Sequence, residues 1–345
     1  MTTPVLICDD SSVARKAMAR SLPGDWDIEI SYAVHGEDAI EQLKNGKGDI
    51  LFLDLNMPVM DGYQTLEAIV KNDIQTMVIV VSGDIQPEAH ARVKALGAVE
   101  FIKKPIGADE LSQVIQKHGL YAPSVNQTET SQAITAPVGR SEKELEAAGT
   151  IKYRDAVQEI ANVAMGQAAD LLARLLDVFV KLPIPNVNIL EVSELKMALS
   201  HVEQGDTYSA VCQGFIGSGI AGEALLVFSD SSYTDMAKLL KYQGEINDTV
   251  ELELIIDIAS ILVGSCIGGI AQQLDIAFSQ GHPVVLGQHV KINDLVKANE
   301  NRWTKTLAIE ITYEIENYDI TCDLLLLFTE DSIDNLNLRL SYLMD

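Results

Sequence analysis

Residues 50–62 read ILFLDLNMPVMDG, and this stretch decides the first part of the fold. Its first four residues are apolar without alternation, which is typical of a strand buried on both faces of a parallel sheet. The strand ends in Asp54, and Gly62 permits a tight turn before a helical pattern begins at Tyr63. Because binding groups in open α/β sheets lie beyond the carboxyl ends of the strands, this position predicts a reactive role for Asp54.

The same pattern recurs through residues 1–120. Apolar runs at 5–8, 77–81 and 99–102 predict further strands, and the segments between them have helical spacing. The result is a five-fold β–α alternation, which predicts a doubly wound parallel α/β sheet. The strand ends would present these side chains at one edge: Asp9, Asp10, Asp54, Ser82 and Lys104. Clustered carboxylates repel one another, so the pattern predicts a hard divalent cation, Mg²⁺.

The composition excludes several classes of protein. A net charge of −25 makes nucleic acid and anionic lipid poor partners. The four cysteines are far apart in apolar segments, which predicts reduced core residues in a cytoplasmic protein. Asp9 and Asp10 interrupt the first apolar run too early for a signal peptide. The longest apolar run, 258–271, is too short to span a bilayer, so no membrane insertion is expected.

The order Asp-Asp, Asp-x-x-Met-Pro-x-Met-x-Gly, Ser and Lys-Pro resembles a response-regulator receiver domain of the CheY type over residues 1–120. The resemblance implies that Asp54 is the phosphoacceptor and that a histidine kinase is the phosphodonor. It implies a Mg²⁺ site built from Asp9, Asp10, Asp54 and the backbone carbonyl of Asn56. It also implies that Ser82 and Lys104 bind the phosphoryl group, with Phe101 as the switching aromatic residue.

Residues 121–141 are polar and contain proline and glycine, which predicts a flexible linker. Residues 142–345 then repeat themselves. Glu159, Asn162 and Pro185 recur as Asp257, Ser260 and Pro283, each 98 positions later, and 224–230 is echoed by 324–330. We expect one α/β domain with internal pseudo-two-fold symmetry, in copies at about 150–245 and 248–345. Each copy is predicted to run long helix, strand, short helix, two strands and helix, with long helices at 153–179 and 249–274 and hairpins at 208–228 and 306–328.

The first of these long helices is predicted to be amphipathic. Its buried face would consist of Ile160, Val163, Ala164, Leu171, Leu172 and Leu175. The opposite, exposed stripe would carry Asp155, Glu159, Asn162, Gly166 and Asp170.

The arrangement Glu-x-x-Asn-x₂₂-Pro on duplicated helices resembles the CheC/CheX family of chemotaxis phosphatases. The resemblance implies hydrolysis of the aspartyl-phosphate on a receiver, either the chain's own or that of a separate CheY-like protein. Asn162 would orient the attacking water and Glu159 would anchor the receiver. Asp257 and Ser260 depart from the family pattern, so they are expected to form a degenerate second site.

Three hypotheses follow for the whole chain. The first is a phosphatase controlled by phosphorylation of Asp54. The second is a non-catalytic adaptor, also controlled by the receiver, that binds a chemotaxis or flagellar partner. The third is a transcription factor, which the acidic second half and the absence of a basic recognition helix disfavour. A metal-dependent hydrolase has no support, because the six histidines show no ligand spacing.

Overall fold

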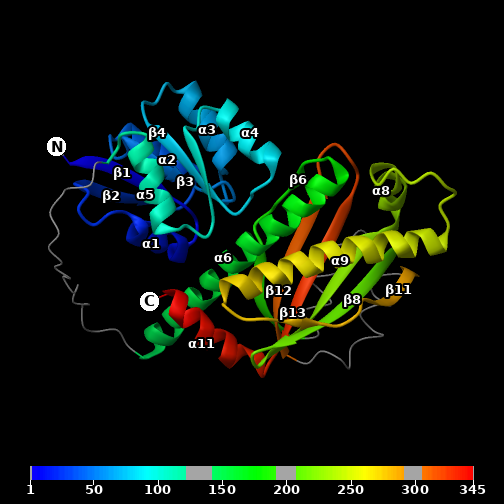
Figure 1. Cartoon of the computed structure of the whole chain (residues 1–345). Coiled ribbons are helices and arrows are strands. Elements are labelled where there is room, and N and C mark those ends of the chain that lie inside the picture. The colour runs from blue at the N-terminus through cyan, green and yellow to red at the C-terminus, as the bar shows by residue number, and fades with distance from the viewer. Residues whose placement is uncertain (1, 122–141, 192–206, 291–304, 345) are drawn as a thin grey trace. The chain divides into compact units, whose positions relative to one another are not determined.

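The structure is a computed structural model that describes residues 2–121, 142–191, 207–290 and 305–344 (Figure 1). The predicted linker, apart from its first residue, lies outside the described residues, as does the stretch of each copy in which a short helix was predicted. The chain divides into two compact units. The first comprises Met1–Val81 and Val93–Ala156, and the second comprises Ser82–Arg92 and Val157–Asp345.

A five-stranded sheet forms the N-terminal fold, in the order β2-β1-β3-β4-β5. The pairs β1–β2, β1–β3 and β3–β4 are parallel, which confirms the predicted α/β fold. The strands are β1 (Thr3–Cys8), β2 (Ile28–Ala33), β3 (Ile50–Leu53), β4 (Met77–Ser82) and β5 (Glu100–Lys103). The helices are α1 (Ser12–Ser21), α2 (Gly36–Lys44), α3 (Gly62–Lys71), α4 (Pro87–Ala95) and α5 (Ala108–Lys117).

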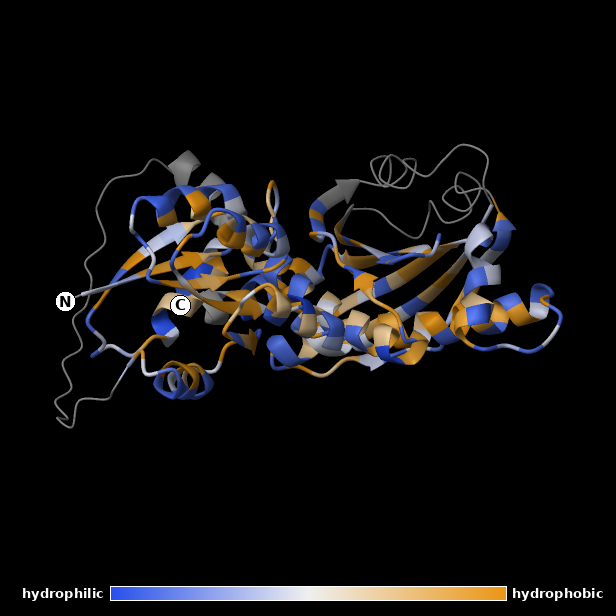
Figure 2. Cartoon of the chain, turned by 90° about the horizontal axis from the view of Figure 1, so that it is seen from above, coloured by the Kyte–Doolittle hydropathy of each residue, from blue (hydrophilic) through white to orange (hydrophobic). Residues whose placement is uncertain are grey.

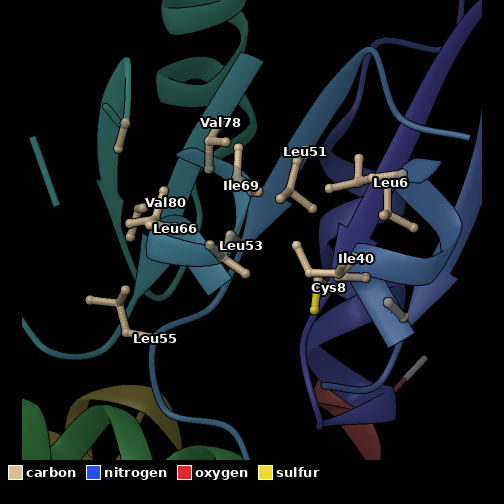
Figure 3. Close-up of a cluster of buried hydrophobic side chains, with 14 of the residues drawn as sticks. Leu6, Cys8, Ile40, Leu51, Leu53, Leu55, Leu66, Ile69, Val78 and Val80 are labelled. Atoms are coloured by element: carbon tan, nitrogen blue, oxygen red, sulfur yellow. The ribbon is translucent and has the colours of Figure 1, made fainter. Parts of the chain in front are cut away.

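The core of this fold lies on both faces of the sheet, because successive side chains of a strand point to opposite faces. Leu51 and Leu53 of β3 belong to one cluster, which Figure 3 shows together with Leu66 of α3. Ile50 and Phe52 of the same strand belong to the cluster on the other face. The uninterrupted apolar run of β3 is thereby explained.

A mixed α/β fold with an antiparallel sheet forms the C-terminal region. Its sheet runs β10-β8-β9-β13-β12-β6, with β11 paired to β8 and β7 paired to β12. The strands are β6 (Val180–Lys181), β7 (Asn186–Glu191), β8 (Tyr208–Gly217), β9 (Ile220–Ser229), β10 (Ser279–Gln280), β11 (Val284–Val290), β12 (Lys305–Ile315) and β13 (Thr321–Thr329). The helices are α6 (Glu142–Leu176), the 3₁₀ turn η1 (Asp230–Ser232), α8 (Tyr233–Leu239), α9 (Asp248–Gln273) and α11 (Ser332–Met344). Both predicted hairpins are present, as β8–β9 and β12–β13.

The two long helices, α6 and α9, approach each other closely. A Cβ atom on Gly269 of α9 would lie 2.9 Å from the Cα atom of Ala164 in α6. In Figure 2 the strands of both sheets carry many residues coloured as hydrophobic. α9 is long and apolar enough by length and composition to cross a membrane, but 61% of its most apolar window is buried inside the structure.

All four cysteines are free and buried, as predicted.

The predicted two faces of α6 are only partly right. Ile160, Val163, Ala164 and Leu172 are buried as expected, but Leu171 and Leu175 are 50% and 49% exposed. In the stripe predicted to be exposed, Asn162 is only 5% and Asp170 only 8% exposed. The reason is that the helix packs on more than one side, so its buried residues do not form the single apolar face that was predicted.

Candidate functional site

Asp54 directly follows β3, and backbone groups of neighbouring residues hold it in place. Its backbone N–H donates to the carbonyl of Cys8 in β1 (2.9 Å), and its side chain is buried. The N–H of Asn56 donates to the Oδ2 atom of Asp54 (3.2 Å). Gly62 passes so close that a Cβ atom there would lie 2.4 Å from the carbonyl oxygen of Asp54. Glycine at this position therefore allows the loop after β3 to fold back over the acid.

Three carboxylates meet beside this strand end. Asp9, Asp10 and Asp54 each offer a ligand oxygen, and these oxygens all lie within 4.8 Å of one another. Asp9 is held by the N–H of Ser11, which donates to its Oδ1 atom (2.8 Å). Ser11 also caps α1, because its side chain accepts from the N–H of Ala14.

A buried lysine offsets part of this negative charge. The Nζ atom of Lys104 lies 2.7 Å from Oδ2 of Asp9 and 3.3 Å from Oδ1 of Asp54. Lys104 brings one positive charge to three carboxylates. Burial, with the neighbouring Asp9 as the next cause, raises the pKa of Asp10 to about 6.

These residues fit Mg²⁺, which prefers hard oxygen ligands and compensates clustered carboxylates. Removing the excess negative charge would lower the pKa of Asp10 again, since desolvation and like charge are what raise it. Ser82 ends β4, the strand next to β3, and is fully buried. Phe101 in β5 is partly buried against the core cluster that contains Leu53 and Val80.

The residues predicted as the phosphatase site and as its degenerate copy lie on two different helices. On α6, Glu159 is partly buried and Asn162 is buried, contrary to the exposed position expected for both. On α9, Asp257 and Ser260 are exposed, and the Oγ atom of Ser260 donates to the carbonyl of Ile256 (2.8 Å). The hydroxyl of Ser260 thus bonds to its own helix.

Sequence reasoning missed a group around His289. Its Nδ1 atom lies 2.9 Å from Asp230 and its Nε2 atom 3.1 Å from Glu251, with Asp248 close by. The carboxylate of Asp230 is the main cause that raises the pKa of His289. No local spacing signals this group, because η1, α9 and β11 bring its members together from distant parts of the sequence.

Comparison with known proteins identifies the first part of the chain. Residues 5–116 match the family model of the response regulator receiver domain. Residues 5–116 form a receiver domain. A protein-glutamate methylesterase/protein-glutamine glutaminase of Geobacter sulfurreducens is 41% identical over 102 residues, which is 29% of this chain and 27% of that protein. A protein of the same name from Syntrophomonas wolfei is 33% identical over 150 residues, 41% of this chain and 42% of that protein.

The chain therefore spans less than half the length of these relatives. A crystal structure of Thermotoga maritima FliY covers 55% of this chain and 96% of its own, at 18% identity and a TM-score of 0.42. That similarity is too low to bear on function.

The predicted aspartyl-phosphate phosphatase activity is wrong by these comparisons. The relatives are named protein-glutamate methylesterase/protein-glutamine glutaminase, and none of these names is that of a CheC-type phosphatase. The roles given to Glu159 and Asn162, and a CheY-like substrate, followed from that resemblance and lose its support.

Proposed function

We propose that this chain is a two-component response regulator whose receiver is phosphorylated on Asp54 and whose second unit responds to that modification. The supporting observation is the cluster of Asp9, Asp10 and Asp54, in which buried Lys104 contacts Asp9 and Asp54. The name shared by the relatives favours a chemotaxis-type pathway, with a histidine kinase as phosphodonor. A cytoplasmic location, which four free cysteines fit, belongs to the same proposal.

In this proposal a carboxylate oxygen of Asp54 attacks the phosphorus atom of a phosphohistidine in line. A P–O bond forms as the P–N bond breaks, and the electron pair leaves with the imidazole, which takes up a proton. The Lys104 ammonium, 3.3 Å from Oδ1 of Asp54, offsets the charge of the phosphoryl oxygens. Asp9, Asp10, Asp54 and the carbonyl of Asn56 would hold Mg²⁺, which neutralises further charge on the phosphoryl group when bound.

The roles of Ser82 and Phe101 are part of the proposal. Ser82 lies at the end of the strand beside β3, so its hydroxyl is placed to donate to a phosphoryl oxygen. Phe101 is partly buried, which leaves its ring able to change position when the site changes.

We also propose that the C-terminal region from α6 onward consists of two copies of one supersecondary unit. Each half runs long helix, two strands, a strand pair and a shorter helix within the described residues. Leu225 and Leu325 occupy equivalent positions of the two halves, and they pair with each other between β9 and β13. β7 of the first half pairs with β12 of the second, and β11 of the second pairs with β8 of the first. Because strands of each half pair with strands of the other, the two halves would fold together.

Phosphorylation is tested by treating the full chain with acetyl phosphate and Mg²⁺ and measuring intact mass. We expect one added phosphoryl group, which Asp54→Ala abolishes and omission of Mg²⁺ greatly reduces. Asp61→Asn is the matched control, because Asp61 is an acid in the same loop that caps α3, and asparagine caps equally well. Undiminished labelling of Asp54→Ala would refute the proposal.

A further inference from the structure

His289 lies where β11 departs from regular strand pairing. The register of β11 on β8 shifts between Gly287 and Val290. His289 falls between these two residues, and its φ of 54° is a left-handed conformation that is uncommon for residues other than glycine. Strand irregularities of this kind re-aim a side chain, and strained backbone is concentrated at functional sites. The imidazole of His289 is thereby directed at η1 and at the start of α9.

The imidazole of His289 is held by a carboxylate that is itself held in place. Its Nδ1 atom lies 2.9 Å from Oδ2 of Asp230, and Oδ1 of Asp230 accepts from the hydroxyl of Ser209 (3.0 Å). The backbone N–H of His289 donates to the same hydroxyl (3.4 Å), and Ser209 is buried. Metal-binding histidines commonly donate their second ring N–H to a carboxylate in this way. A proton that Asp230 draws to Nδ1 leaves Nε2 as the ligand atom.

The Nε2 atom of His289 faces two acids in the first turn of α9. It lies 3.1 Å from Oε2 of Glu251. Asp248, Glu251 and His289 each offer one ligand atom, and these atoms all lie within 4.8 Å of one another. The amide of Gln288 donates to the carbonyl of Asp248 (2.8 Å), which ties β11 to the same turn. The backbone therefore keeps the three donors together.

The Oε2 atom of Glu251 calls for a cation. This atom is buried and has no hydrogen-bond partner among the described residues. Its contact with His289 has the distance of an ion pair without the geometry of a hydrogen bond, so a proton on Nε2 is not directed at it. A buried oxygen without a partner costs stability. A metal ion between the two atoms would satisfy both, because it requires no linear alignment of donor, hydrogen and acceptor.

The donor set indicates which class of metal ion fits. The carboxylates of Asp230, Asp248 and Glu251 surround one imidazole, and the positive end of the α9 dipole offsets only part of their charge. Mg²⁺ and Ca²⁺ prefer oxygen ligands alone, whereas an imidazole nitrogen suits Zn²⁺ and related transition metals. Donors at the usual 2.0–2.2 Å from a tetrahedral Zn²⁺ ion lie about 3.3 Å apart. The 3.1 Å between His289 and Glu251 is close to that spacing.

We propose that Asp248, Glu251 and His289 bind a transition-metal dication of the Zn²⁺ type, with Asp230 as a positioning residue that orients the imidazole. Three protein donors leave one position of a tetrahedral ion for water or an external ligand. The ion joins β11 to the first turn of α9 and so stabilises the C-terminal region. This site uses none of the residues of the receiver cluster, and it does not depend on phosphorylation of Asp54.

The test is the binding of Zn²⁺ to the full chain, measured by isothermal titration calorimetry. Every protein compared carries Asp10→Asn, and excess Mg²⁺ is present, so that the receiver cluster contributes little zinc binding. Asp230→Asn should weaken the affinity about tenfold, as for outer partners of metal ligands, and His289→Gln should weaken it by more than about 100-fold. His282→Gln is the matched control, because His282 is an exposed histidine just before β11 and lies outside the group, so affinity should not change.

Differential scanning calorimetry gives an independent readout. Zn²⁺ at about 100 times its Kd should raise the melting temperature of the C-terminal region by roughly 5–10 °C. This shift should be lost in His289→Gln. Asp248→Asn provides a second variant if His289→Gln fails to fold, because Asp248 is exposed and its substitution disturbs no core packing. It should also lose most of the shift.

Equal zinc affinity in the reference protein and in His289→Gln would overturn the proposal. A zinc-induced rise in melting temperature that persists in Asp248→Asn would overturn it as well. Displacement of the bound zinc by an equal concentration of Ca²⁺ would contradict the metal class, because it would indicate a site built from oxygen ligands alone.

Discussion

Replacing Gly166 with alanine tests the close packing on α6. The new Cβ atom would lie 2.0 Å from the carbonyl oxygen and 2.5 Å from the carbonyl carbon of Gly83. Because these are backbone atoms, the chain around Gly83 has to move by about 1 Å, and overpacking of this kind costs about 1–3 kcal/mol. Alanine in a helix interior returns about 1 kcal/mol relative to glycine. We therefore expect Gly166→Ala to lower the free energy of unfolding by up to about 2 kcal/mol.

Gly264→Ala is the matched control on α9. The nearest atom to a Cβ there is Oε1 of Gln280 at 3.9 Å, so only the helix-propensity gain applies and the variant should be about 1 kcal/mol more stable than wild type. Urea denaturation followed by circular dichroism measures both changes. Hydrogen exchange should also quicken in Ser82–Arg92 for Gly166→Ala alone. Equal stabilisation by the two substitutions would refute the contact between Gly83 and Gly166.

Two further predictions concern titrating groups. A carboxyl group whose folded pKa is raised costs stability above that pKa, and the cost disappears as pH falls through it. For Asp10, a pKa shift from 3.8 to about 6 corresponds to a stability cost of about 3 kcal/mol at most. Without Mg²⁺, Asp10→Asn should therefore stabilise the protein at pH 7 and hardly at pH 4. A stability gain that is equal at both pH values would contradict this. The same variant should lose Mg²⁺-dependent phosphorylation. The pKa of His289 is also raised, so its contacts with Asp230 and Glu251 stabilise below the unfolded pKa and are lost as pH rises through the folded one; denaturation of His289→Gln should show a larger deficit at pH 6 than at pH 9.

The receiver half was predictable because its signals are local. Strands such as β3 are buried on both faces, so they appear in the sequence as unbroken apolar runs that end at polar residues. The strand β2 was not located, because its alternating exposure at the edge of the sheet leaves a weaker apolar signal. The carboxylate cluster followed from topology, since parallel strands end at the same edge.

In the C-terminal region the long helices and hairpins could be predicted, but which of their residues are buried could not. The hairpins β8–β9 and β12–β13 were located from the internal repeat. The environment of α6 was not, because the sequence shows which residues share a helix face but not what packs there. Leu171 and Leu175 are exposed and Asn162 is buried for that reason. The phosphatase prediction was also wrong, because it interpreted a short sequence motif on α6 as a catalytic site.

By itself the sequence determined the receiver fold, the strand-end acids, and the long helices and hairpins of the C-terminal region, because these depend on local periodicity and turn chemistry. Only the tertiary structure decided that Gln86 fastens to Val180, that Arg92 reaches Glu316 and that Gly166 meets Gly83. Each of these contacts joins residues that are far apart in the chain. Their energies come from burial and hydrogen-bond geometry, which exist only once the chain has folded.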